Sequence, residues 1–90
     1  MTSISILVKG KVQGVFYRQS AKEKALELGI VGQIKNQPDG SVFIIATGDE
    51  YQLTQFIKWC RTGPSRAVVS ALETSSEPLQ NFDTFNIIRH

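Results

Sequence analysis

The chain has 90 residues, of which 41% are hydrophobic, and ten Lys and Arg against eight Asp and Glu give a net charge of +2. The composition contains no linker or low-complexity tract and predicts one globular domain over residues 1–90. The charge is too small to indicate nucleic-acid binding by itself. No apolar run is long enough for a signal peptide or a membrane span, and one cysteine, Cys60, excludes an internal disulfide or a multi-cysteine zinc site. We therefore expect a cytoplasmic protein.

The first half of the chain predicts a strand, a loop and a helix. Apolar and polar residues alternate from Ser3 to Val12, as in a half-buried strand. After a loop, apolar residues recur at helical spacing and predict a helix from about Tyr17 to Leu28. Gly29 then stands where many helices end in the left-handed conformation.

The second half predicts a hairpin, a helix and one or two further strands. The β-branched segments IVGQIKN (30–36) and SVFIIATG (41–48) are typical of strands, and the Pro-Asp-Gly between them is typical of a turn. Asp49 and Gln52 form a capping-box pattern at the start of a second helix, which ends before the Gly-Pro at 63–64. AVVSALE (67–73) predicts a fourth strand, and FNIIR (85–89) predicts a short fifth strand or an extension packed along the sheet.

This order is β-α-β-β-α-β with a short C-terminal strand, which predicts an α+β protein with a ferredoxin-like fold. Each helix has one apolar face, so both helices should cover one face of an antiparallel sheet.

The loop in KGKVQGVFYRQS, residues 9–20, has the composition of an anion site. Gly14 lets the backbone approach a ligand closely, and loop amides together with the amides of a helix N-terminus attract anions. Arg18 lies in the first helical turn, where the positive end of the helix dipole disfavours a cation. Its charge is stabilised there only if an anion lies between it and those amides. The loop is neither a Walker A motif nor a GxGxxG motif. Spacing alone leaves an ordinary turn and an anion site equally open.

Chain order brings a second polar residue to this loop. A strand, a helix and a parallel strand place the C-terminal ends of both strands at one edge of the sheet. We therefore expect Asn36, which ends the second strand, to lie near Arg18, with the two strands as neighbours. An uncharged amide in this place is suited to positioning a water molecule.

Three segments resemble the acylphosphatase family. GKVQGVFYR, from Gly10, resembles its G-x-V-Q-G-V-x-[FY]-R block. GQIKNQPDGSV, from Gly32, resembles G-x-x-x-N-x-x-D-G-x-V, and GPSRAVV, from Gly63, resembles G-P-x-x-A-x-V. Many members carry an aromatic residue where this chain has Gln33. This departure affects the packing beside the expected site but replaces neither functional residue.

The resemblance implies an enzyme that hydrolyses the carboxyl-phosphate bond of acyl phosphates to a carboxylate and inorganic phosphate. It implies that Arg18 binds the phosphoryl group and that Asn36 orients the attacking water. The backbone amides implied to bind phosphate are those of Gln13, Gly14, Val15, Phe16, Tyr17 and Arg18. The resemblance also implies no metal, no organic cofactor and no protein base, because the substrate phosphate assists in activating the water. Phosphate and other small anions are then product or inhibitors.

Two other functions share the predicted fold. One is a non-catalytic, acylphosphatase-like module that binds an anion. The other is an RNA-binding module, which requires several exposed aromatic residues on the sheet, whereas the third strand offers only Phe43. We expect a monomer that binds small molecules and neither nucleic acid nor membranes.

Other residues receive structural interpretations. At least one of Phe16 and Tyr17 is expected in the core. Cys60 and Trp59 are expected to pack on or beside the apolar stripe of the second helix, and His90 is expected to be a solvated terminus.

Overall fold

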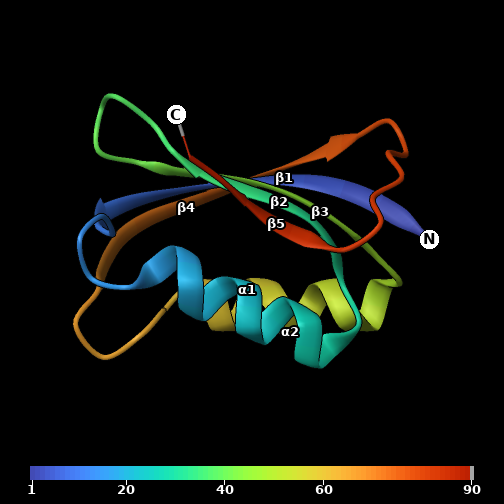
Figure 1. Cartoon of the computed structure of the whole chain (residues 1–90), viewed down its shortest axis with the longest axis horizontal. Coiled ribbons are helices and arrows are strands. Elements are labelled where there is room, and N and C mark those ends of the chain that lie inside the picture. Colours follow the sequence, from blue (N-terminus) through green and yellow to red (C-terminus); the bar gives the residue numbers. More distant parts are fainter. Residues whose placement is uncertain (90) are drawn as a thin grey trace.

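The computed structural model describes residues 1–89, and its elements follow the predicted order (Figure 1). The strands are β1 (Thr2–Lys11), β2 (Val31–Asn36), β3 (Val42–Gly48), β4 (Val68–Glu77) and β5 (Phe85–Ile88), and the helices are α1 (Tyr17–Leu28) and α2 (Glu50–Cys60). The predicted bounds of α1 are confirmed. β4 continues beyond the predicted segment 67–73 because its polar end still pairs with β1. The prediction for His90 lies outside the described residues.

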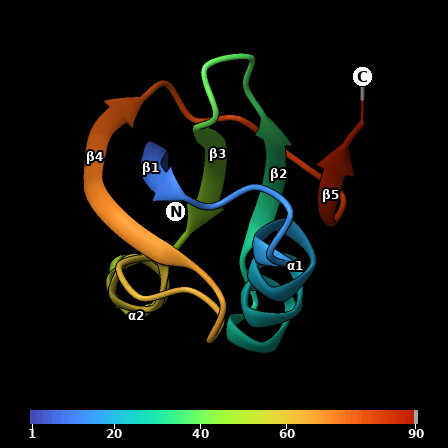
Figure 2. The ribbon, with the colours of Figure 1, turned by 90° about the vertical axis from the view of Figure 1, so that its left-hand side faces the viewer.

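The five strands form one sheet in the order β4-β1-β3-β2-β5 (Figure 2). The predicted antiparallel sheet is wrong at β5, which pairs with β2 in parallel. β4 ends where Glu77 pairs with Ser3, at the start of β1, and residues 78–84 carry the chain from there to the opposite edge of the sheet. β5 therefore enters beside Gly32, near the start of β2, and runs in the same direction as β2.

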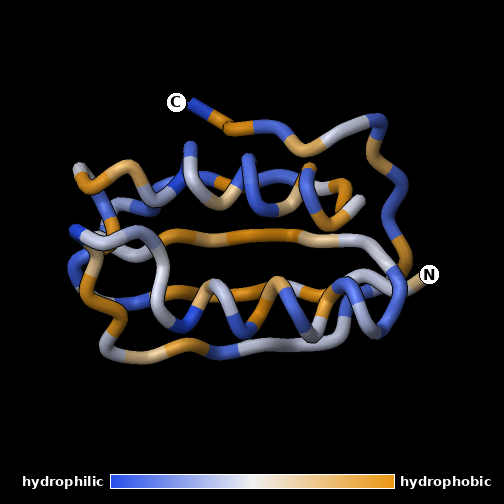
Figure 3. The backbone as a smooth tube through the Cα atoms, turned by 90° about the horizontal axis from the view of Figure 1, so that it is seen from below, coloured by the Kyte–Doolittle hydropathy of each residue, from blue (hydrophilic) through white to orange (hydrophobic). Residues whose placement is uncertain are grey.

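Both helices cover one face of the sheet, as predicted (Figure 1). β3 is the central strand; it is coloured hydrophobic along most of its length in Figure 3 and contributes Val42, Ile44 and Ala46 to the core. Phe56 of α2 packs edge-on against Phe85 of β5, with ring centroids 5.9 Å apart. Complete burial of such a side chain contributes about 1.5–3 kcal/mol. Within residues 1–89, neither helix is long and apolar enough to cross a lipid bilayer.

The predicted helix ends are confirmed. Gly29 has φ 77°, and the N–H of Ile30 donates to the carbonyl of Ala25 over 2.8 Å, which closes the last turn of α1. At the start of α2, Asp49 and Gln52 form the complete capping box.

Candidate active site

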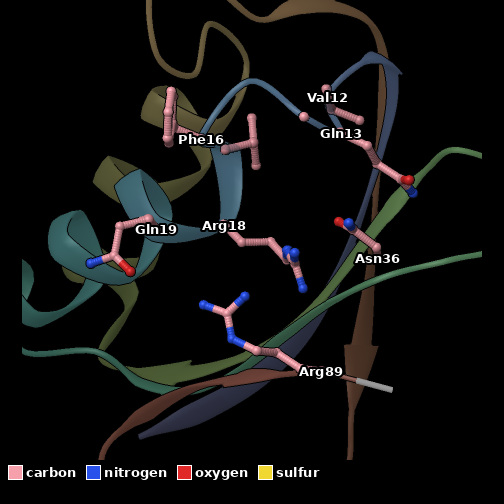
Figure 4. A pocket seen from close by; sticks show the side chains of 9 residues that line it. Val12, Gln13, Phe16, Arg18, Gln19, Asn36 and Arg89 are labelled. Atoms are coloured by element: carbon pink, nitrogen blue, oxygen red, sulfur yellow. The ribbon is translucent and has the colours of Figure 1, made fainter.

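One edge of the sheet holds a cavity of about 450 Å³ at the C-terminal ends of β1 and β2 (Figure 4). It is lined by Val12, Gln13, Gly14, Phe16, Tyr17, Arg18, Gln19, Asn36 and Arg89. The structure therefore brings Arg18 and Asn36 to one cavity. The expectation that their strands are neighbours is wrong, because β3 lies between β1 and β2. Each strand pairs with β3 rather than with the other, and the loop after β1 and helix α1 span the distance.

The loop between β1 and α1 contains two left-handed residues, Gly14 with φ 74° and Phe16 with φ 64°. A phenylalanine in this conformation is strained by about 1–2 kcal/mol. The strain persists because the side chains of Val12, Val15 and Tyr17 are buried in the core and hold the loop in place. Val15 is not among the residues that line the cavity. Of the two aromatic residues, Tyr17 is in the core, as expected for at least one of them, and Phe16 is exposed at the cavity.

The N-terminus of α1 faces this cavity, and no side chain of residues 1–89 caps it. Its N-cap residue is Phe16, which offers no side-chain oxygen, and the first turn contains no acidic residue. The first amides of a helix have no partner within the helix. These N–H groups and the positive end of the helix dipole therefore favour an anion in the cavity.

The two glycines of the first sequence block have different roles. Gly10 still lies in β1, at the register shift between Lys9 and Gly10 where β1 pairs with β4. A Cβ atom on Gly10 would lie 2.2 Å from the carbonyl oxygen of Val68, so this glycine permits close strand pairing. A Cβ on Gly14 would meet nothing within 4 Å. Within the protein, Gly14 is therefore required for its backbone conformation and not for close packing.

Tyr17 fastens the start of α1 to the end of α2. Its hydroxyl donates to the carbonyl oxygen of Cys60 over 2.8 Å, and its ring lies 5.5 Å from that of Trp59. Burial raises the pKa of the Tyr17 hydroxyl far above its ordinary value and the pKa of the Cys60 thiol to about 12. Both groups are therefore neutral near pH 7. The predicted burial of Cys60 is confirmed, and Trp59 is partly buried against the core, as expected.

Asn36 brings an unsatisfied acceptor to the cavity. Its Oδ1 atom is buried and has no hydrogen-bond partner among residues 1–89. A buried polar atom without a partner costs about 1–3 kcal/mol. Such an atom beside a cavity is a candidate acceptor for a hydrogen bond from a bound water molecule or a ligand.

Arg89 was missed by the sequence analysis. It follows β5 and points toward Arg18 in the cavity (Figure 4). The parallel direction of β5 and β2 brings their C-terminal ends to one edge, and alternation along β5 places Arg89 in phase with the core residue Phe85. The sequence signal was the alternation in FNIIR, but it does not give the direction of the strand.

The cavity is positively charged. Arg18 and Arg89 line it, no acidic residue lines it, and within the described part of the chain neither arginine forms an ion pair. The described residues also contain no group of three or more His, Cys, Asp or Glu side chains placed to hold a metal ion. These features suit an anionic ligand.

Two residues considered in the sequence analysis lie away from the cavity. Gln33 is not among the lining residues, and it occupies the opposite phase of β2 from the core residue Ile34. Phe43 occupies the corresponding phase of β3, on the face that the helices leave open, with Lys35 Nζ 6.0 Å from its ring centroid.

The comparisons with known proteins agree with this geometry. The acylphosphatase family model matches residues 4–87. The chain belongs to the acylphosphatase family. An acylphosphatase of Marinobacter nauticus is 48% identical over 81 residues, which cover 89% of this chain and 88% of the relative. The acylphosphatase structure from Bacillus subtilis has a TM-score of 0.95 at 30% identity and covers 99% of this chain and 100% of that chain. The structure of the acylphosphatase from Coxiella burnetii has a TM-score of 0.93 at 34% identity, over 97% of this chain and 92% of that chain.

These similarities extend over nearly the whole chain and support acylphosphatase activity, the hydrolysis of acyl phosphates. An acylphosphatase acts on a small anionic substrate, and both charged residues that line the cavity are arginines.

Proposed function

We propose that this acylphosphatase binds the phosphoryl group of its substrate with the backbone amides of residues 13–18 and the guanidinium of Arg18. Two observations support this proposal: no side chain of the described residues caps the amides at the start of α1, and no acidic residue lines the cavity. The planar guanidinium can donate two hydrogen bonds to two phosphoryl oxygens. Arg89 adds a second positive charge on the side of Arg18 away from the loop (Figure 4).

The observation that carries the proposed mechanism is the unpartnered Oδ1 of Asn36. This atom accepts a hydrogen bond from the attacking water and directs the free lone pair of the water toward phosphorus. Holding the nucleophile at attacking distance removes much of the entropic barrier to the reaction.

In the proposed reaction the water oxygen forms a bond to phosphorus, and the bond between phosphorus and the acyl oxygen breaks. The electron pair of that bond leaves with the carboxylate. A proton of the water passes to a phosphoryl oxygen, so the products are a carboxylate and inorganic phosphate. Phosphoryl transfer depends mainly on positioning and on stabilising the charge of the phosphoryl group, and the loop and Arg18 perform both tasks in this mechanism.

The test is hydrolysis of benzoyl phosphate in the presence of a chelator by the wild type and by folded Arg18→Ala and Asn36→Ala variants. We expect an active wild type and a loss of about 10²–10³ in kcat/KM for each variant. Lys22→Ala, which removes a cation one turn further along α1, and Asn86→Ala, on β5, are matched controls outside the cavity. An inactive wild type that binds phosphate would instead indicate a non-catalytic anion-binding module.

A further inference from the structure

The side chain of Gln13 connects the loop between β1 and α1, which is the proposed phosphate-binding loop, to the turn that follows Asn36. Its Nε2 donates to the carbonyl oxygens of Gln37 and Ser41, each over 2.9 Å. A primary amide nitrogen carries two hydrogens, so both donors of Gln13 are used. The two acceptors lie at the two ends of the turn between β2 and β3.

The turn has its own hydrogen bonds, which do not reach the loop. The N–H of Gln37 donates to the carbonyl of Ser41 over 2.8 Å, and Gln37 Nε2 donates to Ser41 Oγ over 3.0 Å. Asp39 Oδ1 accepts hydrogen bonds from both the N–H and the Oγ of Ser41. The turn is therefore closed without Gln13, and the two bonds from Gln13 serve to fix it relative to the loop.

The path of β1 explains why such a connection is needed. Pairing between β1 and β3 ends at Val8 and Val42, and the register of β1 against β4 shifts between Lys9 and Gly10. Beyond Val8, no residue pair of the sheet ladder joins β1 to the hairpin that carries Asn36. The two bonds from Gln13 continue the connection where the ladder has stopped.

We propose that the side chain of Gln13 is a positioning residue that sets the placement of Asn36 relative to the phosphate loop. The inference rests on the proposed function, in which the loop holds phosphate and Asn36 holds the water. Asn36 directly precedes Gln37, whose carbonyl Gln13 holds, so a movement of the turn moves Asn36. Gln13 thereby controls the alignment of water with phosphorus, while its own backbone amide remains in the loop.

The first experiment compares Gln13→Met with the wild type. Methionine has a similar length but no donor, and the backbone amides of the loop remain. We expect kcat for benzoyl phosphate to fall about tenfold, because a small misplacement of a reacting group has a large kinetic cost. The inhibition constant for inorganic phosphate should stay within about twofold, because Arg18 and the loop still bind the anion.

The second experiment uses Gln13→Glu, whose effect depends on pH. A protonated carboxyl can donate one hydrogen bond to a carbonyl, whereas a carboxylate donates none and is repelled by both carbonyl dipoles. The ordinary pKa of glutamate is about 4.3; the two carbonyl dipoles favour the protonated form of the new carboxyl, whereas Arg18 and Arg89, which line the same cavity, favour the carboxylate. The ratio of Gln13→Glu to wild-type kcat should therefore rise as the pH falls from 7 to 4.5, whereas the Gln13→Met ratio should stay constant.

Gln37→Ala is the matched control. It removes a glutamine amide from the same turn but leaves the carbonyl of Gln37 to accept from Gln13, so we expect kcat within about twofold of the wild type. The inference is overturned if Gln13→Met keeps the wild-type kcat. It is also overturned if Gln13→Met loses kcat and phosphate affinity by equal factors and the ratio of Gln13→Glu to wild-type kcat does not change with pH.

A measurement that does not depend on turnover separates the two proposals. The side-chain amide resonances of Asn36 in the NMR spectrum should shift more in Gln13→Met than in Gln37→Ala. Unchanged resonances in both variants overturn the positioning role. A wild type that does not hydrolyse benzoyl phosphate overturns the proposed function instead, and the resonances still decide whether Gln13 sets the position of Asn36.

Discussion

The loop of residues 12–18 lines the cavity, and the turn of residues 37–41 directly follows Asn36, which also lines it, but the loop and the turn are held in different ways. The loop is anchored by apolar side chains, since Val12, Val15 and Tyr17 are each at most 3% exposed, and it contains the strained Phe16. The turn is held by polar groups, chiefly the hydrogen bonds of Asp39 with Ser41.

This difference indicates a division of roles between the two regions. A loop held by the core keeps its amides in one arrangement before an anion arrives, and this preorganisation favours binding. The turn depends on the hydrogen bonds of the exposed Asp39 with the buried Ser41, which respond to pH and to substitution, and the two bonds from Gln13 add a connection to the loop. The following predictions test this contrast, from the largest expected effect to the smallest.

The largest effect should distinguish Arg18 from Asn36. Arg18→Ala should lower kcat by about 10²–10³ and also weaken inhibition by phosphate, because in the proposed mechanism Arg18 binds the anion before and during the reaction. Asn36→Ala should lower kcat by a similar factor and leave the phosphate inhibition constant within about twofold, because in the proposed mechanism Asn36 contacts the water and not the phosphoryl group. Steady-state kinetics with benzoyl phosphate and phosphate measure both values. Equal effects of the two variants on phosphate inhibition would contradict the division of roles.

A pair of glycines provides the next test. Gly14 has φ 74° in the loop and Gly40 has φ 93° in the turn, and a Cβ on either would meet nothing within 4 Å. Alanine at either position should therefore cost about 1–2 kcal/mol of stability through backbone strain alone. We expect Gly14→Ala to lower kcat/KM at least about tenfold, because the loop amides must move to relieve the strain.

Gly40→Ala should keep kcat/KM within about twofold, because the two hydrogen bonds from Gln13 hold both ends of the turn and with them Asn36. Urea unfolding and benzoyl phosphate hydrolysis measure the two quantities. If the glycine variants lose activity equally, the loop and the turn do not differ as proposed.

The anchor beneath the loop should affect stability more than catalysis. Tyr17→Phe removes the hydroxyl that donates to the carbonyl of Cys60 and leaves that buried acceptor without this partner. We expect the free energy of unfolding to fall by about 1–2 kcal/mol while the ring keeps its packing. Chemical denaturation and the specific activity of the folded protein test this. A large loss of activity without loss of stability would show that the hydroxyl has a catalytic role.

The smallest effect concerns Asp39 and pH. Hydrogen bonds from Ser41 hold the pKa of this exposed carboxyl below its ordinary value. A lowered pKa in the folded state stabilises the protein above the unfolded-state pKa of about 3.9, and this contribution is lost as the pH falls through the lowered value. Wild type should therefore be slightly more stable than Asp39→Asn at pH 6, and the difference should shrink at pH 2.5. Urea unfolding at both pH values is the measurement, and a constant difference would refute the role of Asp39.

Local patterns predicted the order of the elements and the ends of the helices because the interactions involved are short in sequence. The end of α1 at Gly29 and the capping box of Asp49 with Gln52 depend on hydrogen bonds within a few residues. The order of elements, together with the family resemblance of the two segments that contain Arg18 and Asn36, predicted that these residues lie at one edge of the sheet. Both line the cavity.

The tertiary structure alone decided features that depend on contacts between distant segments. Alternation in a strand carries no direction, so FNIIR did not reveal the parallel pairing of β5 or the arrival of Arg89 at the cavity. The sequence presented Gly10 and Gly14 as one motif, but the close approach of β4 gives Gly10 a separate role. Hydrogen bonds from Gln13 reach 24 and 28 residues along the chain, and only the folded sheet brings these groups within bonding distance.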